Sequence, residues 1–154
     1  MLASSKLVQL EPNVAASQGA GAGSMMKSGL TMGLKKVKAK ASIRGPKATT
    51  RVDGNAEFYF YGSSFNPNEF VLVKLESNGE SREMVTGEVG MLGFKNGIRE
   101  EDQVKITATK LDGGIYKVVS AKSLKPNEYG FINAASGVSV LANGVRLWDF
   151  GVER

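Results

Sequence analysis

Carboxylates and lysines are the side chains of this sequence that could do chemistry near neutral pH. The 154-residue chain contains neither His nor Cys. Their absence excludes an imidazole base, a Ser-His-Asp triad, a thiol nucleophile and a thiolate zinc site. Any catalysis would need a carboxylate or a lysine with a strongly shifted pKa. We expect no enzyme activity and no cofactor.

Acidic residues occur in two arrangements that could form a site. Glu100, Glu101 and Asp102 are adjacent and could ligate a hard cation, but they lack the spacing of an EF-hand, which favours a solvated turn. Four glutamates could meet in space as the pair of a glycoside hydrolase, although nothing in their spacing indicates a cleft: Glu57, Glu69, Glu83 and Glu88. We predict exposed charge in both cases, and no metal site.

Two short motifs resemble nucleotide-binding sequences. The GAGAGS run at 19–24 has the composition of a phosphate loop, but it has no strand before it, no helix after it and no third glycine at the right spacing. Asp149-Phe150-Gly151 spells the metal-binding triplet of kinases in a chain that lacks the required His and is too short for a kinase. We interpret the first as a linker and the second as the end of a strand.

The basic segment 35–47 (KKVKAKASIRGPK) is the most informative stretch. Residues 1–52 carry nine basic side chains and one acidic one, so the net charge of +5 comes from the N-terminal third. Lys36, Lys38 and Lys40 alternate with small apolar residues, so an extended backbone places the ammonium groups on one side. We predict partner binding through the cationic side chains of this segment: Lys35, Lys36, Lys38, Lys40, Arg44 and Lys47.

Three interpretations of this segment remain open. It could add a strand to the edge of a neighbouring protein beside an acidic surface. It could follow a phosphate backbone, although no aromatic residue interleaves the lysines to stack on bases. It could also be a solvated tail. Protein contact is the preferred interpretation.

The remainder of the sequence has the pattern of short strands and tight turns. Asn78-Gly79 predicts a two-residue hairpin turn with a positive φ at Gly79, and 112–114 (DGG) predicts a second hairpin. Residues 97–102 indicate one helical turn. Strands are expected at 48–52, 57–61, 70–75, 82–89, 103–111, 115–121, 128–133 and 145–152, with both faces of 57–61 covered.

Seven or eight such strands predict an all-β fold, and an antiparallel, Ig-like β-sandwich is preferred over a small barrel. Residues 1–40 are expected to form an extended Gly/Ser/Lys-rich arm, and residues 41–154 the sandwich domain. Trp148, the one tryptophan, is expected to be a core or interface anchor.

Several of these segments resemble a group of uncharacterised bacterial β-domains. They are EFYFY at 57–61, NEFVLVKL at 68–75, DGGIYKV at 112–118, LKPNEYGF at 124–131 and WDFGV at 148–152. The sequence has Pro126-Asn127 where that group usually has Pro-Gly, a change that a turn in the left-handed region tolerates. The resemblance implies a compact β-domain and no known activity.

Two classes of function follow from these patterns. The first is a structural component of a large assembly, most simply a capsid or head accessory (decoration) protein of a phage virion, oligomeric there, whose arm docks on neighbouring subunits. The alternative is a nucleic-acid-associated protein that binds phosphate through the same lysines, and a carbohydrate-binding protein or carboxylate-dependent enzyme ranks third. The first ten residues predict no secretory signal peptide, and no membrane contact is expected, so a virion or cytoplasmic location is expected.

Overall fold

The structure, a computed structural model, describes residues 7–18, 37–62, 66–90, 93–134 and 144–153. These residues form strands and short 3-10 turns, which confirms the all-β prediction. The strands are β1 (Pro12–Gln18), β2 (Val37–Arg44), β3 (Arg51–Val52), β4 (Phe58–Tyr61), β5 (Phe70–Ser77), β6 (Ser81–Gly90), β7 (Gly93–Asn96), β8 (Gln103–Val104), β9 (Ile106–Lys110), β10 (Ile115–Ser120), β11 (Asn127–Asn133) and β12 (Val145–Val152). The 3-10 turns are η1 (Pro67–Glu69), η2 (Glu100–Asp102) and η3 (Asp112–Gly114).

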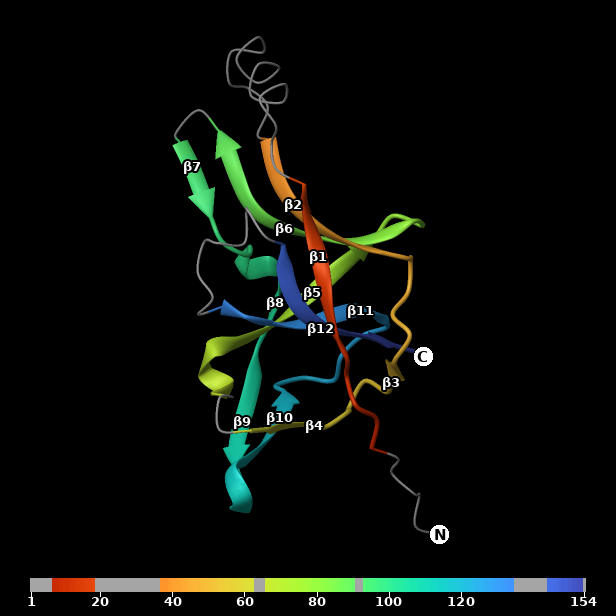
Figure 1. Cartoon of the computed structure of the whole chain (residues 1–154), viewed down its shortest axis with the longest axis vertical. Coiled ribbons are helices and arrows are strands. Elements are labelled where there is room, and N and C mark those ends of the chain that lie inside the picture. Colours follow the sequence, from red (N-terminus) through yellow and green to blue (C-terminus); the bar gives the residue numbers. More distant parts are fainter. Residues whose placement is uncertain (1–6, 19–36, 63–65, 91–92, 135–143, 154) are drawn as a thin grey trace.

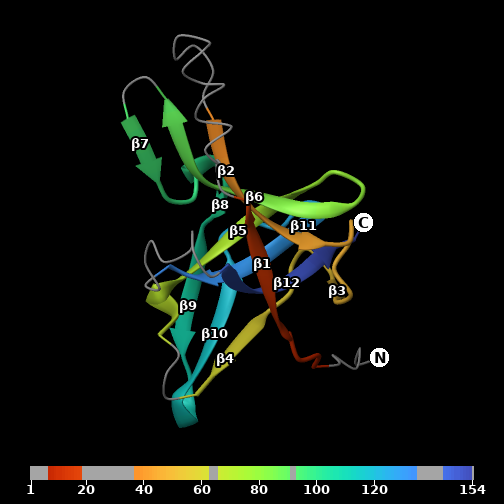
Figure 2. The same cartoon turned by 45° about the horizontal axis from the view of Figure 1, so that its top comes forward.

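Six antiparallel strands close into a barrel in the order β1, β2, β6, β5, β11, β12 and back to β1 (Figures 1 and 2). The predicted Ig-like sandwich is therefore not confirmed. Closure depends on β1, which pairs with β12 through Pro12 to Ala15 and with β2 through Ala16 to Gln18. Because the barrel is closed, each of its six strands is paired on both sides.

The predicted boundary between an arm and a domain differs from the structure. Residues 12–18 and 37–40, which the sequence analysis assigned to the arm, form β1 and the first half of β2 in the barrel wall. The small side chains of this region explain the difference, because Ala15, Ala39 and Ala41 are buried where a narrow barrel has little interior space. Of the remainder of the predicted arm, residues 7–11 lead into β1 without regular secondary structure, and residues 1–6 and 19–36 lie outside the described residues.

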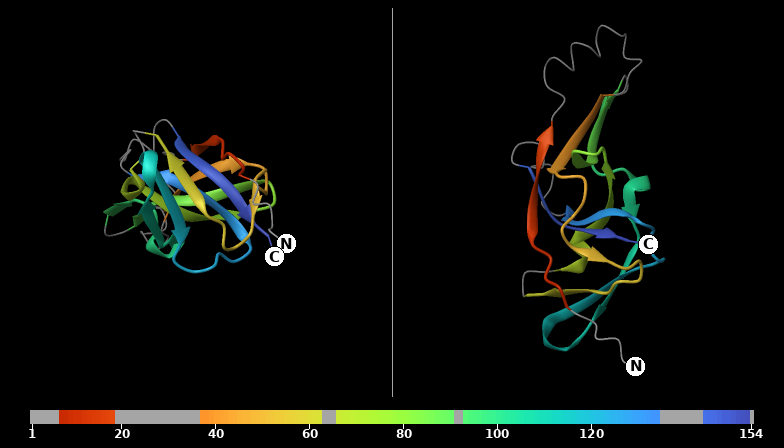
Figure 3. Two further views of the ribbon diagram at one scale, coloured as in Figure 1. Left: turned by 90° about the horizontal axis from the view of Figure 1, so that it is seen from below. Right: turned by 90° about the vertical axis from the view of Figure 1, so that its right-hand side faces the viewer.

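A second, three-stranded sheet in the order β4, β10, β9 lies at one end of the molecule (Figures 1 and 3). Its inner face packs on the outside of the barrel. The ring of Phe58 on β4 lies 4.9 Å from that of Phe131 on β11 and 4.7 Å from that of Phe150 on β12. The ring of Phe60 on β4 lies 5.1 Å from that of Phe70 on β5.

Two hydrophobic cores result, and the same strands contribute to both. Alternate residues of β5 show this, since Leu72 faces the second sheet, Val73 faces the barrel interior, and both are 0% exposed. The barrel core contains Ala15, Ala41, Ile43, Val73, Leu75, Met84, Ile132, Val145 and Leu147. The core between the barrel and the second sheet contains Phe58, Phe70, Leu72, Val118, Leu124, Tyr129, Phe131, Phe150 and Val152. Burial on both faces explains the nearly continuous apolar sequence of β5.

The hairpin between β5 and β6 forms one residue later than predicted. The Asn78 N–H donates to the Ser81 carbonyl over 3.0 Å, so the two loop residues are Gly79 and Glu80. The positive φ predicted for Gly79 is confirmed at 91°. The Asn78 side chain accounts for the shift, because its Oδ1 accepts from the N–H groups of Glu80 (3.0 Å) and Ser81 (2.8 Å). The second predicted hairpin is confirmed, with η3 joining β9 to β10.

Candidate interaction surfaces

The predicted basic residues that the structure describes lie on or just after β2. Lys38, Lys40 and Arg44 alternate with buried Ala39, Ala41 and Ile43, so they lie on the outer face of the barrel. The predicted alternation is thus confirmed within the described part of the segment, although the strand belongs to the barrel. Lys47 is exposed in the loop that follows, whereas Lys35 and Lys36 lie outside the described residues.

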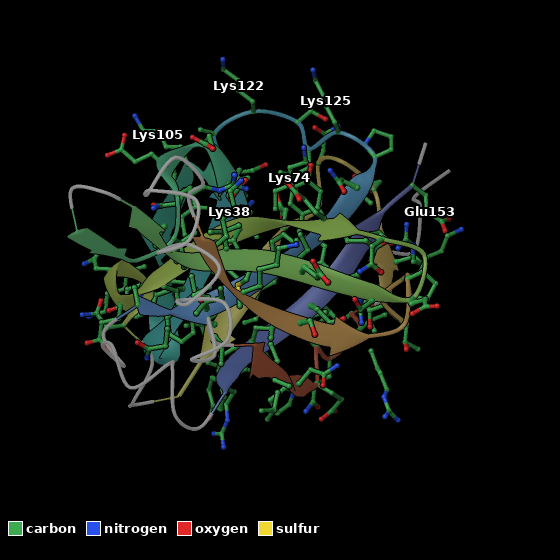
Figure 4. The ribbon with its side chains drawn as sticks, turned by 90° about the horizontal axis from the view of Figure 1, so that it is seen from above. Lys38, Lys74, Lys105, Lys122, Lys125 and Glu153 are labelled. Atoms are coloured by element: carbon green, nitrogen blue, oxygen red, sulfur yellow. The ribbon has the colours of Figure 1, made fainter. Side chains whose placement is uncertain are left out.

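Lys40 already has an acidic partner in its own chain. Its ammonium group lies 2.7 Å from the carboxylate of Glu83 on the adjacent strand β6. The Glu83 carboxylate also accepts from the side-chain amide of Asn78 over 2.9 Å. Lys38, in contrast, is exposed and has no ion pair among the described residues (Figure 4). The structure therefore leaves only some of the predicted cations free for a partner.

Trp148 lies on the outer side of β12 and packs partly buried against the core under the second sheet. Its ring centroid is 5.6 Å from that of Phe70. This position places the indole within the packing between the barrel and the second sheet.

The glutamates considered as a hydrolase pair bind different partners. Glu57 binds Lys117, Glu83 binds Lys40, and Glu69 accepts from Asn66 over 3.4 Å. The side chain of Glu88 is outside the described part of the chain.

Two of the three acidic residues of η2 are also paired within the chain. Arg99 lies 2.7 Å from the carboxylate of Asp102 and 3.2 Å from that of Glu101. Among the described residues, no three Asp or Glu side chains are grouped closely enough to hold a metal ion.

A buried group of charged side chains closes one end of the barrel interior. Arg82 on β6 is 3% exposed, and every nitrogen of its guanidinium donates a hydrogen bond. Nη1 binds the carboxylate of Asp149, Nε donates to the Gly45 carbonyl over 3.1 Å, and Nη2 donates to the Arg44 carbonyl over 3.3 Å. The charge of Arg82 is therefore neutralised and its hydrogen-bonding capacity is used inside the protein.

Glu128 on β11 extends this network toward the surface. The residue is 5% exposed. Its carboxylate accepts a hydrogen bond from the Ala48 N–H over 2.7 Å and binds the guanidinium of Arg51. Burial alone would lower the pKa of Arg51, but the hydrogen bonds and charges of Glu128 and Glu153 raise it above its ordinary value. Two arginines thus face the carboxylates of Glu128 and Asp149, so the charges of the inner part of the network balance and both carboxylates have cationic partners within the chain.

This network was not among the sites predicted from the sequence, although the sequence contains a signal for it. Arg82 lies two residues before buried Met84, and Asp149 lies two residues after buried Leu147. In a strand, residues two apart share a face, so both charged residues had to share the face of a core residue. A charge on an apolar face indicates a buried partner.

The outer face of the second sheet exposes aromatic and aliphatic side chains. Phe58 and Phe60 point into the core, so Tyr59 and Tyr61 point outward, and they are 45% and 73% exposed. The expectation that both faces of this strand are covered is wrong for β4. By strand register, seven residues share this outer surface, which we call the tyrosine face: Tyr59, Tyr61, Thr107, Thr109, Ile115, Lys117 and Val119.

One ionic cluster lies on the tyrosine face, and it is internally neutral. The Lys117 ammonium binds the Glu57 carboxylate, and the Tyr59 hydroxyl donates to the same carboxylate over 2.8 Å. These hydrogen bonds lower the pKa of Glu57 and raise those of Lys117 and Tyr59. At neutral pH the cluster carries no net charge, so the tyrosine face offers contact area at a small electrostatic cost.

Both edges of the second sheet are unpaired within the part of the chain that the structure describes. β4 and β9 each pair only with β10. Such an edge presents N–H and C=O groups to which another strand could add.

Exposed lysines lie beside the second sheet, at the end opposite the η3 turn. The carbonyl of Lys105, just before β9, accepts from the Ala121 N–H over 2.8 Å at the end of β10. Lys122 and Lys125 project outward from the following loop on the same side of the molecule as Lys105 (Figure 4). None of the three ammonium groups forms an ion pair within the described residues.

Comparison with family models, with curated proteins and with solved structures finds no match to this chain. The resemblance to bacterial β-domains therefore stays a prediction. Within the described residues there is no helix with the length and apolar character needed to cross a membrane.

Proposed function

We propose that this protein is a non-enzymatic structural component of a larger assembly and that it binds a neighbouring protein through the tyrosine face. The observation that carries the proposal is the exposure of Tyr59 (45%) and Tyr61 (73%) on a sheet whose opposite face is packed. Tyrosine provides a large contact area at low entropic cost and is enriched at protein interfaces. The assembly we favour is a phage virion, with the protein as a capsid or head accessory subunit and the N-terminal segment also docking on neighbours.

The edges of the second sheet support a protein partner. A neighbouring strand placed against β4 or β9 would gain main-chain hydrogen bonds and would lie beside the tyrosine face. The role is proposed as non-enzymatic because the least exposed carboxylates, those of Glu128, Asp102 and Asp149, already bind arginines of this chain. A general acid or base would need one of them free to exchange a proton with a substrate.

Sedimentation of the natural assembly tests the proposal. Tagged full-length protein, produced in cells that make the assembly, should sediment with high-mass particles. The Tyr59→Ser/Tyr61→Ser variant should sediment at least about tenfold less, because hot-spot aromatic residues contribute about 2 kcal/mol or more. Its melting temperature should change little, since both side chains are exposed.

The matched control is Lys122→Ser/Lys125→Ser, which alters two exposed residues in the loop between β10 and β11. This control should sediment like the wild type. Wild-type protein that stays in the low-mass fraction, or a tyrosine variant that sediments normally, would contradict the proposal.

Nucleic-acid binding is the second candidate, and one observation favours it. Tyr59 and Tyr61 are two residues apart on one exposed face, where two bases could stack, and the free ammonium groups of Lys105 and Lys122 lie at the end of the same sheet. Base stacking on an aromatic side chain contributes about 1–3 kcal/mol per base. Fluorescence anisotropy with labelled single-stranded DNA over a salt series distinguishes the two candidates. Salt-dependent binding that the tyrosine variant loses would favour this candidate.

A further inference from the structure

Strand β1 is the one strand that joins β2 to β12. Its first half pairs with β12, with Val14 opposite Arg146, and its second half pairs with β2, with Ser17 opposite Ala41. Without β1, one edge of β2 and one edge of β12 would lose their hydrogen-bonding partners along these registers. The seam between β2 and β12, which we call the β1 seam, is therefore a site shaped for one added strand.

Few side-chain contacts hold β1 in this seam. Of its residues 12–16, whose exposure is defined, only Ala15 is buried, and Val14 is 58% exposed. Among the side chains of β1 that the structure describes, the amide of Asn13 donates to the Asp149 carboxylate over 3.5 Å. The strand is thus held mainly by its backbone, which is the kind of element that opens locally at low free-energy cost.

The sequence between β1 and β2 allows β1 to reach another molecule. Residues 19–36 comprise 18 residues, five of them glycine. A chain of that length can span up to about 60 Å when fully extended. The eight residues of β2 extend about 27 Å. The fully extended connection is therefore longer than one strand of the barrel. That length would allow β1 to leave its own barrel and reach another copy.

We propose that β1 is exchanged between copies of this protein, so that residues 12–18 of one copy occupy the β1 seam of a second copy. The occupant is a second copy because the seam is already shown to fit this sequence, with Ala15 buried at 0% exposure. The strand makes the same contacts in either molecule, so the two arrangements differ mainly in connection entropy and concentration. Exchange is favoured where copies are crowded, as on a particle. The inference deepens the docking of the N-terminal segment in the proposed function, on which it rests, and it does not use the tyrosine face.

Disulfide trapping tests the exchange, since the native chain has no Cys. Two single variants are made, Val14→Cys and Arg146→Cys, at exposed positions that are opposite each other in the ladder. Directly opposite Cβ atoms lie about 4.5–5.5 Å apart, close to the separation that a disulfide needs. The two variants are unfolded together, refolded together at about 1 mM and then oxidised. This concentration approaches the effective concentration that a short flexible linker gives, so exchange between chains can compete with closure within one chain.

We expect a covalent dimer that joins position 14 of one chain to position 146 of another, identified by mass spectrometry of the linked peptides. Its yield should exceed, several-fold, that of a control mixture of Val14→Cys with Lys122→Cys, whose second position is exposed in a distant loop. The yield should fall when refolding is carried out at high dilution. At high dilution, the Val14→Cys/Arg146→Cys double variant should form an intrachain disulfide, which verifies the register.

Two results would overturn the proposal. One is a cross-linked yield no higher than the control while the double variant links within its own chain at every concentration. The other is a double variant that forms no link in either mode, which would mean that β1 does not occupy this register. Repeating the mixture in the Tyr59→Ser/Tyr61→Ser background keeps the two proposals separable, because strand exchange should be unchanged there even if particle binding is lost.

Discussion

The guanidinium of Arg82 binds the carboxylate of Asp149 across the interior of the barrel. Their strands, β6 and β12, are three positions apart in the ring of six strands and so lie on opposite walls. The pair therefore connects two strands that share no backbone hydrogen bond. Arg82 also donates to the carbonyls of Arg44, the last residue of β2, and of Gly45 just after it, which ties the end of that strand to the same point.

Replacement of Arg82 by Met should destabilise the protein strongly. The change leaves the buried carboxylates of Asp149 and Glu128 facing each other with one fewer cation, and breaking a buried pair costs about 3–5 kcal/mol. Urea unfolding followed by fluorescence measures the loss. Lys40→Met, which removes the partly exposed pair with Glu83, should cost less than about 1 kcal/mol. Equal losses in the two variants would argue against a structural role for the buried network.

Truncation before Ala41 should abolish cooperative unfolding. The sequence predicts an arm at 1–40 and a separate domain at 41–154, but the structure places β1 and half of β2 within residues 1–40. Their removal opens the barrel and exposes its core. Thermal unfolding followed by circular dichroism should show no sharp transition, whereas a chain that begins at Leu7, and keeps every described residue, should unfold like the wild type. A sharp transition in the shorter chain would mean that the barrel does not need β1.

Gly79→Val should lower the free energy of unfolding by about 1–2 kcal/mol, because an L side chain at this positive φ is strained. No atom lies within 4 Å of the position its Cβ would take, so steric collision adds nothing. Denaturant unfolding of Gly79→Val and of Glu80→Val, its exposed neighbour in the same turn, isolates the backbone effect. Equal stability of the two variants would show that strain at residue 79 is not the cause.

Alkaline pH should weaken the fold partly through Tyr129. Burial raises the pKa of its phenol, so the folded state retains the proton at a pH where an unfolded tyrosine, with a pKa of about 10, releases it. The stabilisation is complete below pH 10 and is lost as the pH rises through the folded pKa. The free energy of unfolding between pH 8 and 11 should therefore fall less steeply in Tyr129→Phe than in the wild type.

The Tyr129→Phe variant should also be less stable at neutral pH by about 0.5–1.5 kcal/mol, since it loses the hydrogen bond to the Lys125 carbonyl (2.9 Å). Tyr61→Phe, which removes a phenol hydroxyl at an exposed position, is the matched control. Parallel profiles for the wild type and Tyr129→Phe would rule out this contribution.

Local sequence patterns determined the strands and their faces. Alternation of lysine with alanine at 38–41 correctly indicated an extended segment with its cations on one side. Glycine at 79 and 113–114 marked two turns because few other residues adopt a positive φ. These features depend on residues that are neighbours along the chain, so a single sequence contains them.

Tertiary structure alone decided which surfaces are covered. Alternation separates Tyr59 and Tyr61 from Phe58 and Phe60, but it does not tell which face will meet the barrel. Likewise, the sequence places Arg82 on the face of Met84, yet the carboxylate that neutralises it is 67 residues away. Such pairings depend on the order of strands around the barrel, which local patterns do not encode.

Strand β1 shows most clearly the difference between what local sequence patterns predict and what tertiary structure decides. Its sequence, PNVAASQ, is rich in small residues and has one β-branched side chain, so it has little intrinsic preference for a strand. It becomes one because β2 and β12 together present two rows of backbone groups that need hydrogen-bond partners, and because Ala15 is small enough for the interior. The all-β class and the hairpins follow from local sequence patterns, whereas closure of the barrel depends on strands that are distant in the chain and adjacent only after folding.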